Sequence, residues 1–564
     1  MNDTFKIAPI PVIIGITGHR DLFPKDLTAL TEAFSSYIQQ LKTSYPDSPI
    51  TVMSSLASGA DLLAANIALS MQIPVIAPLP LPVDDYLNDF ETEEEKSDFL
   101  KALDQCDKRF IVEQAVPATQ LNTNPLSDRE LAYFSAALYV VKHCDVLVAF
   151  WNGENNDYLA GTAKTVQMML EGFVPPEFRK SGTDFFQTET SGIVYHISTP
   201  RKKSTVLTMP AFSVTKLSGS HSKIVDLLDE LRFLDRFNRE SKRLFINREP
   251  ALEQNRRYLF SVKEENELNA DLSNLLTNFA VADTLAQKYG AKVKNLFNRL
   301  FAIMFISLLI CDIYAHLFYS EAILLVLYLG GLFSALLLFS HSKKKQFESR
   351  YLDYRALAEG CRVMIFWQLA GISQSVSHFY MRKQKNVLNW IRASLQKIES
   401  LNTWQNDPDP KDFAIVYKNW IEDQRIYYRK SALKNEKLYH STEKWMMFFF
   451  IVGVLLTFAN VCAMLFGFIK YPAHWYITIM LLFPFFAVMT ETYGDKRAFK
   501  QHSKRYEFMS QLYDRASLLM KEYLAAEKYE EAQLVIFELG KETLIENGDW
   551  VMLNREKPLD MPKG

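Results

Sequence analysis

Apolar and polar residues follow two different patterns along this chain of 564 residues. Up to about residue 200, short apolar runs alternate with longer segments whose apolar residues recur at helical spacing. This alternation predicts a parallel, doubly wound α/β sheet. The expected strands are 12–14, 50–53, 75–79, 146–151 and 194–198, and the expected helices are 27–43, 60–70, 131–142 and 161–171.

Further along, four apolar stretches stand out, at 300–318, 322–340, 445–469 and 475–490. A membrane-spanning helix needs about 20 residues. The second and third stretches are long enough as they stand. The first, which contains Asp312, and the fourth, which is short and contains Pro484, qualify only with help from interfacial residues.

Basic residues lie at the outer ends of both pairs of stretches, whereas the two connecting loops hold only Lys470. This distribution predicts two helical hairpins with all large segments and both termini in the cytoplasm. The N-terminus has no signal-peptide pattern, in agreement with that topology. Buried helices of a soluble protein are the alternative, which the flanking charges disfavour. These charges are Lys292, Lys294, Arg299, Lys343, Lys344, Lys345, Lys444, Lys496, Arg497 and Lys500.

Each hairpin is followed by a basic cluster and an amphipathic helix, so the membrane region resembles a duplicated unit. The expected domains are therefore 1–235, 236–400 and 401–564. The predicted fold is an α/β Rossmann-like cytoplasmic domain followed by an all-α membrane region, which has four transmembrane helices and long cytoplasmic helices.

Composition narrows the classes of partner. The net charge of -2 shows no excess of basic residues, so no nucleic-acid duplex is expected as a partner. The five cysteines have no metal-ligand spacing, and neither a disulfide framework nor a metal site is predicted. No cofactor is expected either.

Small residues follow three of the predicted strands, and together they are the candidate binding site. Parallel strands place such residues at one edge of the sheet, where ligands bind near the switch in strand order. Small residues let backbone N–H groups approach a phosphate, and an arginine can bind it with two hydrogen bonds. In the alternative interpretation the glycines serve only turns, and Asp61 is an ordinary first-turn acid. The candidates are Gly15, Thr17, Gly18, His19, Arg20, Ala57, Ser58, Gly59, Ala60, Asp61, Trp151, Asn152, Gly153, Gly161 and Thr162.

These runs also resemble a known family. Segments 15–22, 56–61, 78–80, 144–147 and 161–163 are similar to the SLOG superfamily, over roughly residues 8–200. The resemblance implies a Rossmann-like domain that binds nucleotides or nucleotide-derived ligands, and that senses such signals in bacterial defence. The Lonely Guy enzymes of this group carry a catalytic Glu where this chain has Thr165. The departure favours sensing over hydrolysis, and no enzymatic activity is expected.

A second resemblance covers about residues 240–564 as two copies. The runs 354–363 and 366–371, with the tail segments 538–543 and 546–550, look like the SLATT group. SLATT domains are two-transmembrane effectors that accompany SLOG or nucleotide-cyclase sensors and are proposed to permeabilise the membrane.

The two resemblances together imply a multi-pass effector of the bacterial inner membrane in anti-phage defence. The expected signal is a nucleotide-derived second messenger, either cyclic ADP-ribose-like or a cyclic oligonucleotide. An enzyme encoded nearby is expected to make it. Four spans per chain are too few for a wide pore, so a homo-oligomer is expected. Asp312 and His316, one helical turn apart, are either pore residues or residues of the outer interface.

Two other functions stay open. A membrane-tethered nucleotide hydrolase or N-glycosidase needs a well-placed carboxylate, for which Asp61 and Glu130 are the candidates. A transporter fits the duplicated membrane unit. However, both copies have the same expected topology, and the spans are poor in polar residues.

Overall fold

The computed structural model describes residues 8–113, 127–155, 158, 160–172, 192–204, 206–219, 224–380, 385–401 and 408–556. They form two compact units. The sheet unit comprises Met1–Pro250, Ser273–Asn278 and Ser375–Thr403, and the helical unit comprises Ala251–Leu272, Phe279–Gln374 and Trp404–Gly564. The domain limits expected from the sequence follow its duplicated pattern, whereas these two units are defined by contacts in space. The expected limits therefore stay a prediction.

A seven-stranded sheet in the order β4-β3-β2-β1-β5-β6-β7 forms the centre of the sheet unit. The first six strands are parallel, and β7 runs antiparallel to β6. The predicted α/β domain with a mostly parallel sheet is therefore confirmed. The strands are β1 (Val12–Gly18), β2 (Ile50–Met53), β3 (Val75–Leu79), β4 (Lys108–Ile111), β5 (Val146–Trp151), β6 (Ile193–Ser198) and β7 (Val214–Ser218).

The two strands at the edges, β4 and β7, were not predicted. Central strands of this sheet are buried along their whole length, whereas β4 and β7 alternate between exposed and half-buried residues. Edge strands are often protected by charged side chains. In β4 these are Lys108 and Arg109, which hide the strand from a search for apolar runs.

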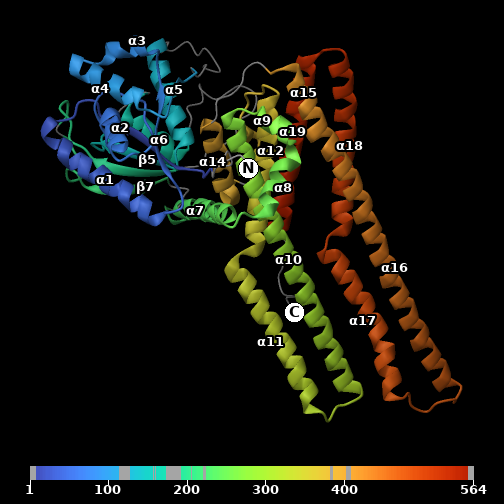
Figure 1. Ribbon diagram of the computed structural model, residues 1–564. Helices are drawn as coiled ribbons and strands as arrows, with labels where there is room; N and C mark the ends of the chain where they lie inside the picture. Colours follow the sequence, from blue (N-terminus) through green and yellow to red (C-terminus); the bar gives the residue numbers. More distant parts are fainter. Residues whose placement is uncertain are drawn as a thin grey trace. The chain divides into compact units, whose positions relative to one another are not determined.

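Helices cover both faces of the sheet (Figure 1). Helix α1 contacts α2, and α2 contacts α4, whereas α5 contacts α6. Right-handed crossovers place the two groups on opposite faces. The helices are α1 (Leu27–Ser44), α2 (Ala60–Ser70), α3 (Val83–Tyr86), α4 (Glu93–Asp104), α5 (Asp128–His143), α6 (Thr162–Glu171), α7 (Ile224–Ile246), α13 (Val376–Phe379) and α14 (Lys385–Leu401).

Helix α14 belongs to the sheet unit although it lies far along the chain. Lys397 Nζ lies 2.9 Å from Asp145 Oδ1, and both side chains are buried. The second oxygen of Asp145 accepts a hydrogen bond from the backbone N–H of Ile13 at 2.8 Å. Asp145 therefore has the structural role that we expect of an acid just before a strand.

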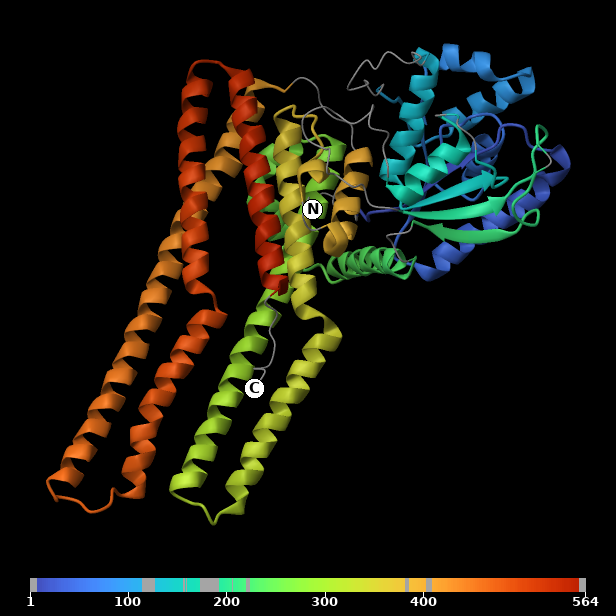
Figure 2. The same cartoon turned by 180° about the vertical axis from the view of Figure 1, so that it is seen from behind.

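The helical unit contains four helices that are long and apolar enough to cross a membrane. They form two hairpins, α10 with α11 and α16 with α17 (Figures 1 and 2). Helix α17 continues through Pro484, and the first and fourth stretches also lie in helices that are long and apolar enough to span. The helices are α8 (Pro250–Leu259), α9 (Val262–Asn266), α10 (Ala270–His316), α11 (Ala322–Lys345), α12 (Phe347–Leu369), α15 (Pro410–Val416), α16 (Asp423–Leu465), α17 (His474–Lys496), α18 (Phe499–Ala525) and α19 (Tyr529–Glu556).

Large apolar side chains cover the outside of the hairpins. Val326 is 60% exposed, Phe333 61% and Phe458 65%. A contiguous apolar surface of this kind is unfavourable in water, whereas it suits the lipid interior. The chain therefore has the layout of a multi-pass membrane protein.

The same backbone break recurs after each hairpin. Gln346 separates α11 from α12 with a φ of 53°, and Ala498 separates α17 from α18 with a φ of 50°. Both residues are left-handed, and in both copies the next helix begins directly afterwards. This recurrence supports the duplication predicted from the sequence.

Candidate functional site

The switch point of the sheet lies between β1 and β5. From β1 the chain proceeds outward through β2, β3 and β4, and then returns through α5 to β5 on the other side. Ligands of such sheets bind beyond the carboxyl ends of the two strands at the switch. Gly18 pairs with Phe150, so His19 and the segment after Trp151 emerge side by side.

Strand β1 is longer than predicted, which corrects the position of the expected glycine turn. It continues through Gly18, so Gly15, Thr17 and Gly18 are strand residues. A Cβ added at Gly15 would lie 2.8 Å from Cys144 Sγ, so this glycine allows close packing in the core. The connection after the strand runs from His19 to Phe23, a 3-10 turn follows at Pro24–Asp26, and α1 begins at Leu27, where the helix was expected.

His19 connects the two strand ends. Its Nε2 accepts a hydrogen bond from the backbone N–H of Asn152 at 3.0 Å. A backbone amide can only donate, so this contact uses the neutral ring with its proton on Nδ1, whereas Asn152 Oδ1, 3.1 Å from the same Nε2, can accept a hydrogen bond only when Nε2 carries the proton. Burial, aided by the charge of Arg201, lowers the pKa of His19 from 6.5 to about 4 and keeps the ring neutral.

We expect His19 to titrate with a midpoint near pH 4 in the folded protein. Because its pKa is lower in the folded chain than in the unfolded chain, the neutral ring stabilises the fold above pH 6.5. That contribution is lost as the pH falls towards 4. NMR of the protein with ring-labelled histidine measures the midpoint, and the signal missing from His19→Gln assigns it. A midpoint near 6.5 would contradict the buried, hydrogen-bonded state.

The loop after β2 packs against the turn after β1. Gly59 has a φ of 86°, and a Cβ added there would lie 2.5 Å from the carbonyl oxygen of Arg20. The backbone N–H of Ala60 donates to the carbonyl of His19 at 3.1 Å. The amide of Ala60 is thus hydrogen-bonded within the protein, and the binding role of this residue stays a prediction.

Asp61 is a buried acid at the start of α2 that has no hydrogen-bond partner for its carboxyl group among the described residues. Burial raises its pKa to about 7, although the charge of Arg20 opposes this shift. Arg20 is exposed, and its guanidinium lies 5.0 Å from the centre of the Tyr133 ring. In the described part of the chain Arg20 forms no ion pair. A strongly shifted acid beside an unpaired cation is typical of a functional site.

The segment after β5 is held mainly by the protein itself. Asn152 Nδ2 donates to Glu154 Oε2 at 3.1 Å and to the carbonyl of Val206 at 3.2 Å. A Cβ on Gly153, whose φ is 85°, would overlap Thr208 Oγ1. Trp151 is buried, and its Nε1 donates to the carbonyl of Glu154. Asn152 therefore lines the switch point, whereas Gly153 and Trp151 have structural contacts.

The remaining predicted residues form other contacts. Ser58 Oγ donates to Glu95 Oε1 at 3.0 Å, and the carbonyl of Ala57 accepts from Leu62. Gly161 and Thr162 begin α6, and within the described ranges no hydrogen bond joins them to His19, Arg20 or Asn152. Their part in binding stays a prediction.

The structure also shows the contacts of the catalytic candidate Glu130 and of the pore candidates Asp312 and His316. Glu130 forms a capping box with Ser127 at the exposed start of α5, which accounts for this carboxylate without catalysis. Asp312 and His316 face each other at 3.2 Å in the last turn of α10, beside the loop of the hairpin. This position agrees with the interpretation as interfacial residues, and their pore role stays a prediction.

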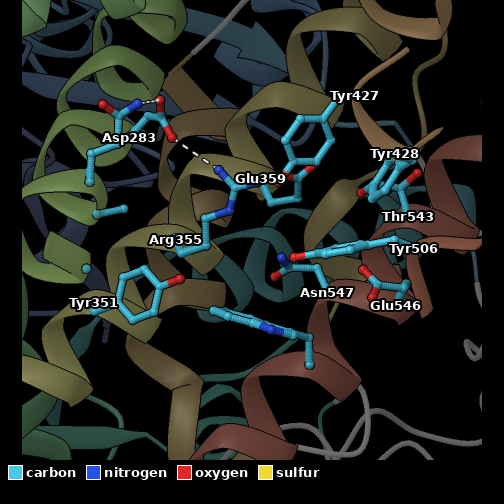
Figure 3. A pocket seen from close by; sticks show the side chains of 14 residues that line it. Asp283, Tyr351, Arg355, Glu359, Tyr427, Tyr428, Tyr506, Thr543, Glu546 and Asn547 are labelled. Carbon is cyan, nitrogen blue, oxygen red and sulfur yellow. Dashed lines mark hydrogen bonds and ion pairs between the residues drawn. The ribbon is translucent and has the colours of Figure 1, made fainter. Parts of the chain in front are cut away.

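Sequence reasoning missed a cavity in the helical unit, shown in Figure 3, with a volume of about 360 Å³. Its lining includes Tyr351, Arg355 and Glu359 of α12, which recur every four residues on one helical face. That spacing is visible in the sequence. It does not reveal the cavity by itself, because the other walls come from α10, α16, α18 and α19.

No family model matches this chain, and no curated protein sequence matches it. The resemblance to SLOG and SLATT proteins therefore stays a prediction. Within the described ranges, no cluster of three or more potential metal ligands is present. The functional inference rests on the residues at the switch point and on the exposed apolar hairpins.

Proposed function

We propose that this protein is a membrane effector of anti-phage defence that senses a nucleotide-derived second messenger. The sheet unit binds the messenger, and the hairpins respond by oligomerising or gating to permeabilise the bacterial inner membrane. One observation carries the proposal: an α/β sheet with an unpaired Arg20 at its switch point shares a chain with four apolar, outwardly exposed helices. Ligand binding shifts a closed–open equilibrium if the ligand favours one of the two states.

The residues at the switch point suit a phosphorylated ligand. The exposed guanidinium of Arg20 can bind two phosphate oxygens at once. Asp61, with a pKa of about 7, can donate or accept a hydrogen bond at neutral pH, as recognition of a ribose hydroxyl or a base requires. A cyclic ADP-ribose-like molecule and a cyclic oligonucleotide both offer these groups.

The charges beside the spans support the topology. Lys343, Lys344 and Lys345 end α11, and Lys496 ends α17, on the side of the hairpins opposite to their loops. Under the positive-inside rule, this side faces the cytoplasm with both termini. Four spans per chain favour a homo-oligomeric pore, and an enzyme encoded nearby would supply the messenger. The SLOG and SLATT resemblances agree with this arrangement.

An N-glycosidase or nucleotide hydrolase is the second candidate, because Asp61 has the property that a general acid needs. A buried carboxyl group with a pKa of about 7 can give up its proton near neutral pH. Thr165 speaks against this function. Its Oγ1 donates to the carbonyl of Gly161 at 3.1 Å within α6, so the position of the expected catalytic Glu holds a structural side chain.

We expect Arg20→Ala to reduce the retained messenger at least about tenfold, as loss of a charge-assisted phosphate contact predicts. Mass spectrometry of small molecules that copurify with the full chain from phage-infected cells measures this effect. Arg232→Ala is the matched control, because that side chain is 70% exposed on α7 of the same unit.

The purified messenger is then added to liposomes that contain the protein and a trapped dye. Messenger-dependent release by the wild type and by Arg232→Ala, but not by Arg20→Ala, is expected. If Arg20→Ala retains as much messenger as the wild type, the assignment of the binding site is wrong. Conversion of the messenger to a cleaved product, without dye release, would instead establish the enzyme.

A further inference from the structure

The cavity in the helical unit, shown from close by in Figure 3, is lined by helices of both hairpins and by the helices that follow them. The first part of α10, before its apolar stretch, and α12, which follows the first hairpin, contribute Asp283 and Tyr351. The first part of α16, before its apolar stretch, and α18, which follows the second hairpin, contribute Tyr427 and Tyr506. Its volume of about 360 Å³ falls in the range of small-molecule sites. A molecule bound there would touch both hairpins at once.

Aromatic rings form much of the wall. Tyr351 meets Trp550 edge to face at 5.7 Å between ring centres. Tyr506 lies 5.9 Å from Tyr428 and 6.4 Å from Tyr427. None of these four tyrosine hydroxyls has a hydrogen-bond partner among the described residues. The wall therefore offers ring faces, which attract cations, and free hydroxyl oxygens, which accept hydrogen bonds.

The charges at the cavity are held in ion pairs. Asp283, Glu359 and Glu546 supply three carboxylates to its lining, whereas Arg355 supplies the only basic side chain among the lining residues. The guanidinium of Arg355 lies 3.2 Å from Asp283 and 3.4 Å from Glu359. Behind the lining, Arg362 lies 3.1 Å from Glu359 and Arg505 lies 3.0 Å from Glu546, so each carboxylate has a basic partner. No free positive charge therefore remains in the lining for an anion such as a phosphate.

We propose that this cavity binds a small organic cation, of the quaternary or protonated amine class. The aromatic wall attracts such ions, the tyrosine hydroxyls can accept their hydrogen bonds, and no unpaired basic side chain in the lining repels them. The occupant would hold the bases of the two hairpins together and so favour one arrangement of the spans. Binding stands independently of the proposed function, whereas an effect on membrane leakage rests on it.

Choline is a suitable probe, because its neutral isostere 3,3-dimethylbutan-1-ol has the same shape without the charge. Each is titrated into the purified full-length protein, and binding is followed by the intrinsic tryptophan fluorescence and by thermal stability. We expect choline to bind and the neutral isostere to bind at least about tenfold more weakly, because the cation–π attraction is lost.

Variants test the site itself. Tyr506→Leu removes one ring face and should weaken choline binding about tenfold, whereas Tyr506→Phe keeps the face and should bind within about threefold of the wild type. Tyr471→Leu is the control, since this tyrosine is 78% exposed in the loop of the second hairpin. If Tyr506→Leu loses stability, the site is still tested by Tyr506→Phe, which should bind choline more tightly than it binds the neutral isostere.

Several results would overturn the inference: no choline binding to the wild type, equal binding of choline and its isostere, or full binding by folded Tyr506→Leu. The leakage assay separates this inference from the proposed function. Choline binding without an effect on messenger-induced leakage would refute the coupling alone. Choline binding to a protein that shows no leakage with any messenger would leave the cation site standing and refute the effector function.

Discussion

Replacing Glu359 with leucine should lower the free energy of unfolding by about 3–5 kcal/mol, the cost of leaving a buried charge unpaired. The Glu359 side chain is only 3% exposed and contacts two arginines. Its Oε2 lies 3.1 Å from Arg362 Nη1, and the side chain of Arg362 is 4% exposed. Without the carboxylate, this buried guanidinium loses its ion pair and keeps Gln424 Oε1, at 3.4 Å, as its hydrogen-bond partner among the described residues. Thermal unfolding of the purified full chain in detergent measures the loss.

A matched control and a rescue make this prediction specific. Glu538→Gln breaks the pair with Lys541, whose side chains are 52% and 27% exposed, and should cost less than about 1 kcal/mol. Adding Arg362→Met to Glu359→Leu should restore much of the lost stability, because an apolar pair can replace a buried ion pair at little cost. If Glu359→Leu and Glu538→Gln lower the free energy of unfolding equally, burial does not determine the cost of breaking these ion pairs.

Lys397→Met should destabilise the sheet unit by about 3 kcal/mol, because it also leaves a buried charge without its ion-pair partner. Lys397 and Asp145 are 3% and 8% exposed, and the substitution leaves Asp145 with the N–H of Ile13 as its remaining partner. Limited proteolysis within residues 375–403 should accelerate at the same time, because the ion pair attaches α14 to the sheet. Both effects can be measured on the full-length protein.

The surface pair of Lys101 and Asp98 is the control for this substitution. These side chains are 67% and 47% exposed, so Lys101→Met should change the stability by less than about 1 kcal/mol. Unchanged protease resistance of 375–403 in Lys397→Met would show that other contacts of α14, such as Lys108 Nζ to the carbonyl of Ser400 at 3.1 Å, are sufficient to attach it.

Local patterns along the chain predict the core elements well. The expected ranges 50–53, 60–70 and 146–151 coincide with β2, α2 and β5. Such elements are set by short runs of buried residues, which are visible in the sequence. Strand β1 was placed too short, because the glycines that suggested a turn serve instead to bring β1 close to α5 and α2.

Long-range contacts account for what sequence reasoning could not find. The Lys397–Asp145 pair joins residues 252 positions apart, and no periodicity signals it. The meeting of His19 and Asn152 could be anticipated, because parallel strands end at one edge. The tyrosine-lined cavity could not, since it is assembled from five separate helices whose packing decides which faces meet.

The left-handed residues Gln346 and Ala498 have a mechanical consequence. Each separates an apolar helix from the helix that follows it at a single residue. A left-handed conformation costs a residue with a Cβ roughly 1–2 kcal/mol, which the surrounding contacts must offset. Both hairpins are therefore followed directly by a residue that carries the same conformational cost, and contacts around each of these two residues must hold the bend.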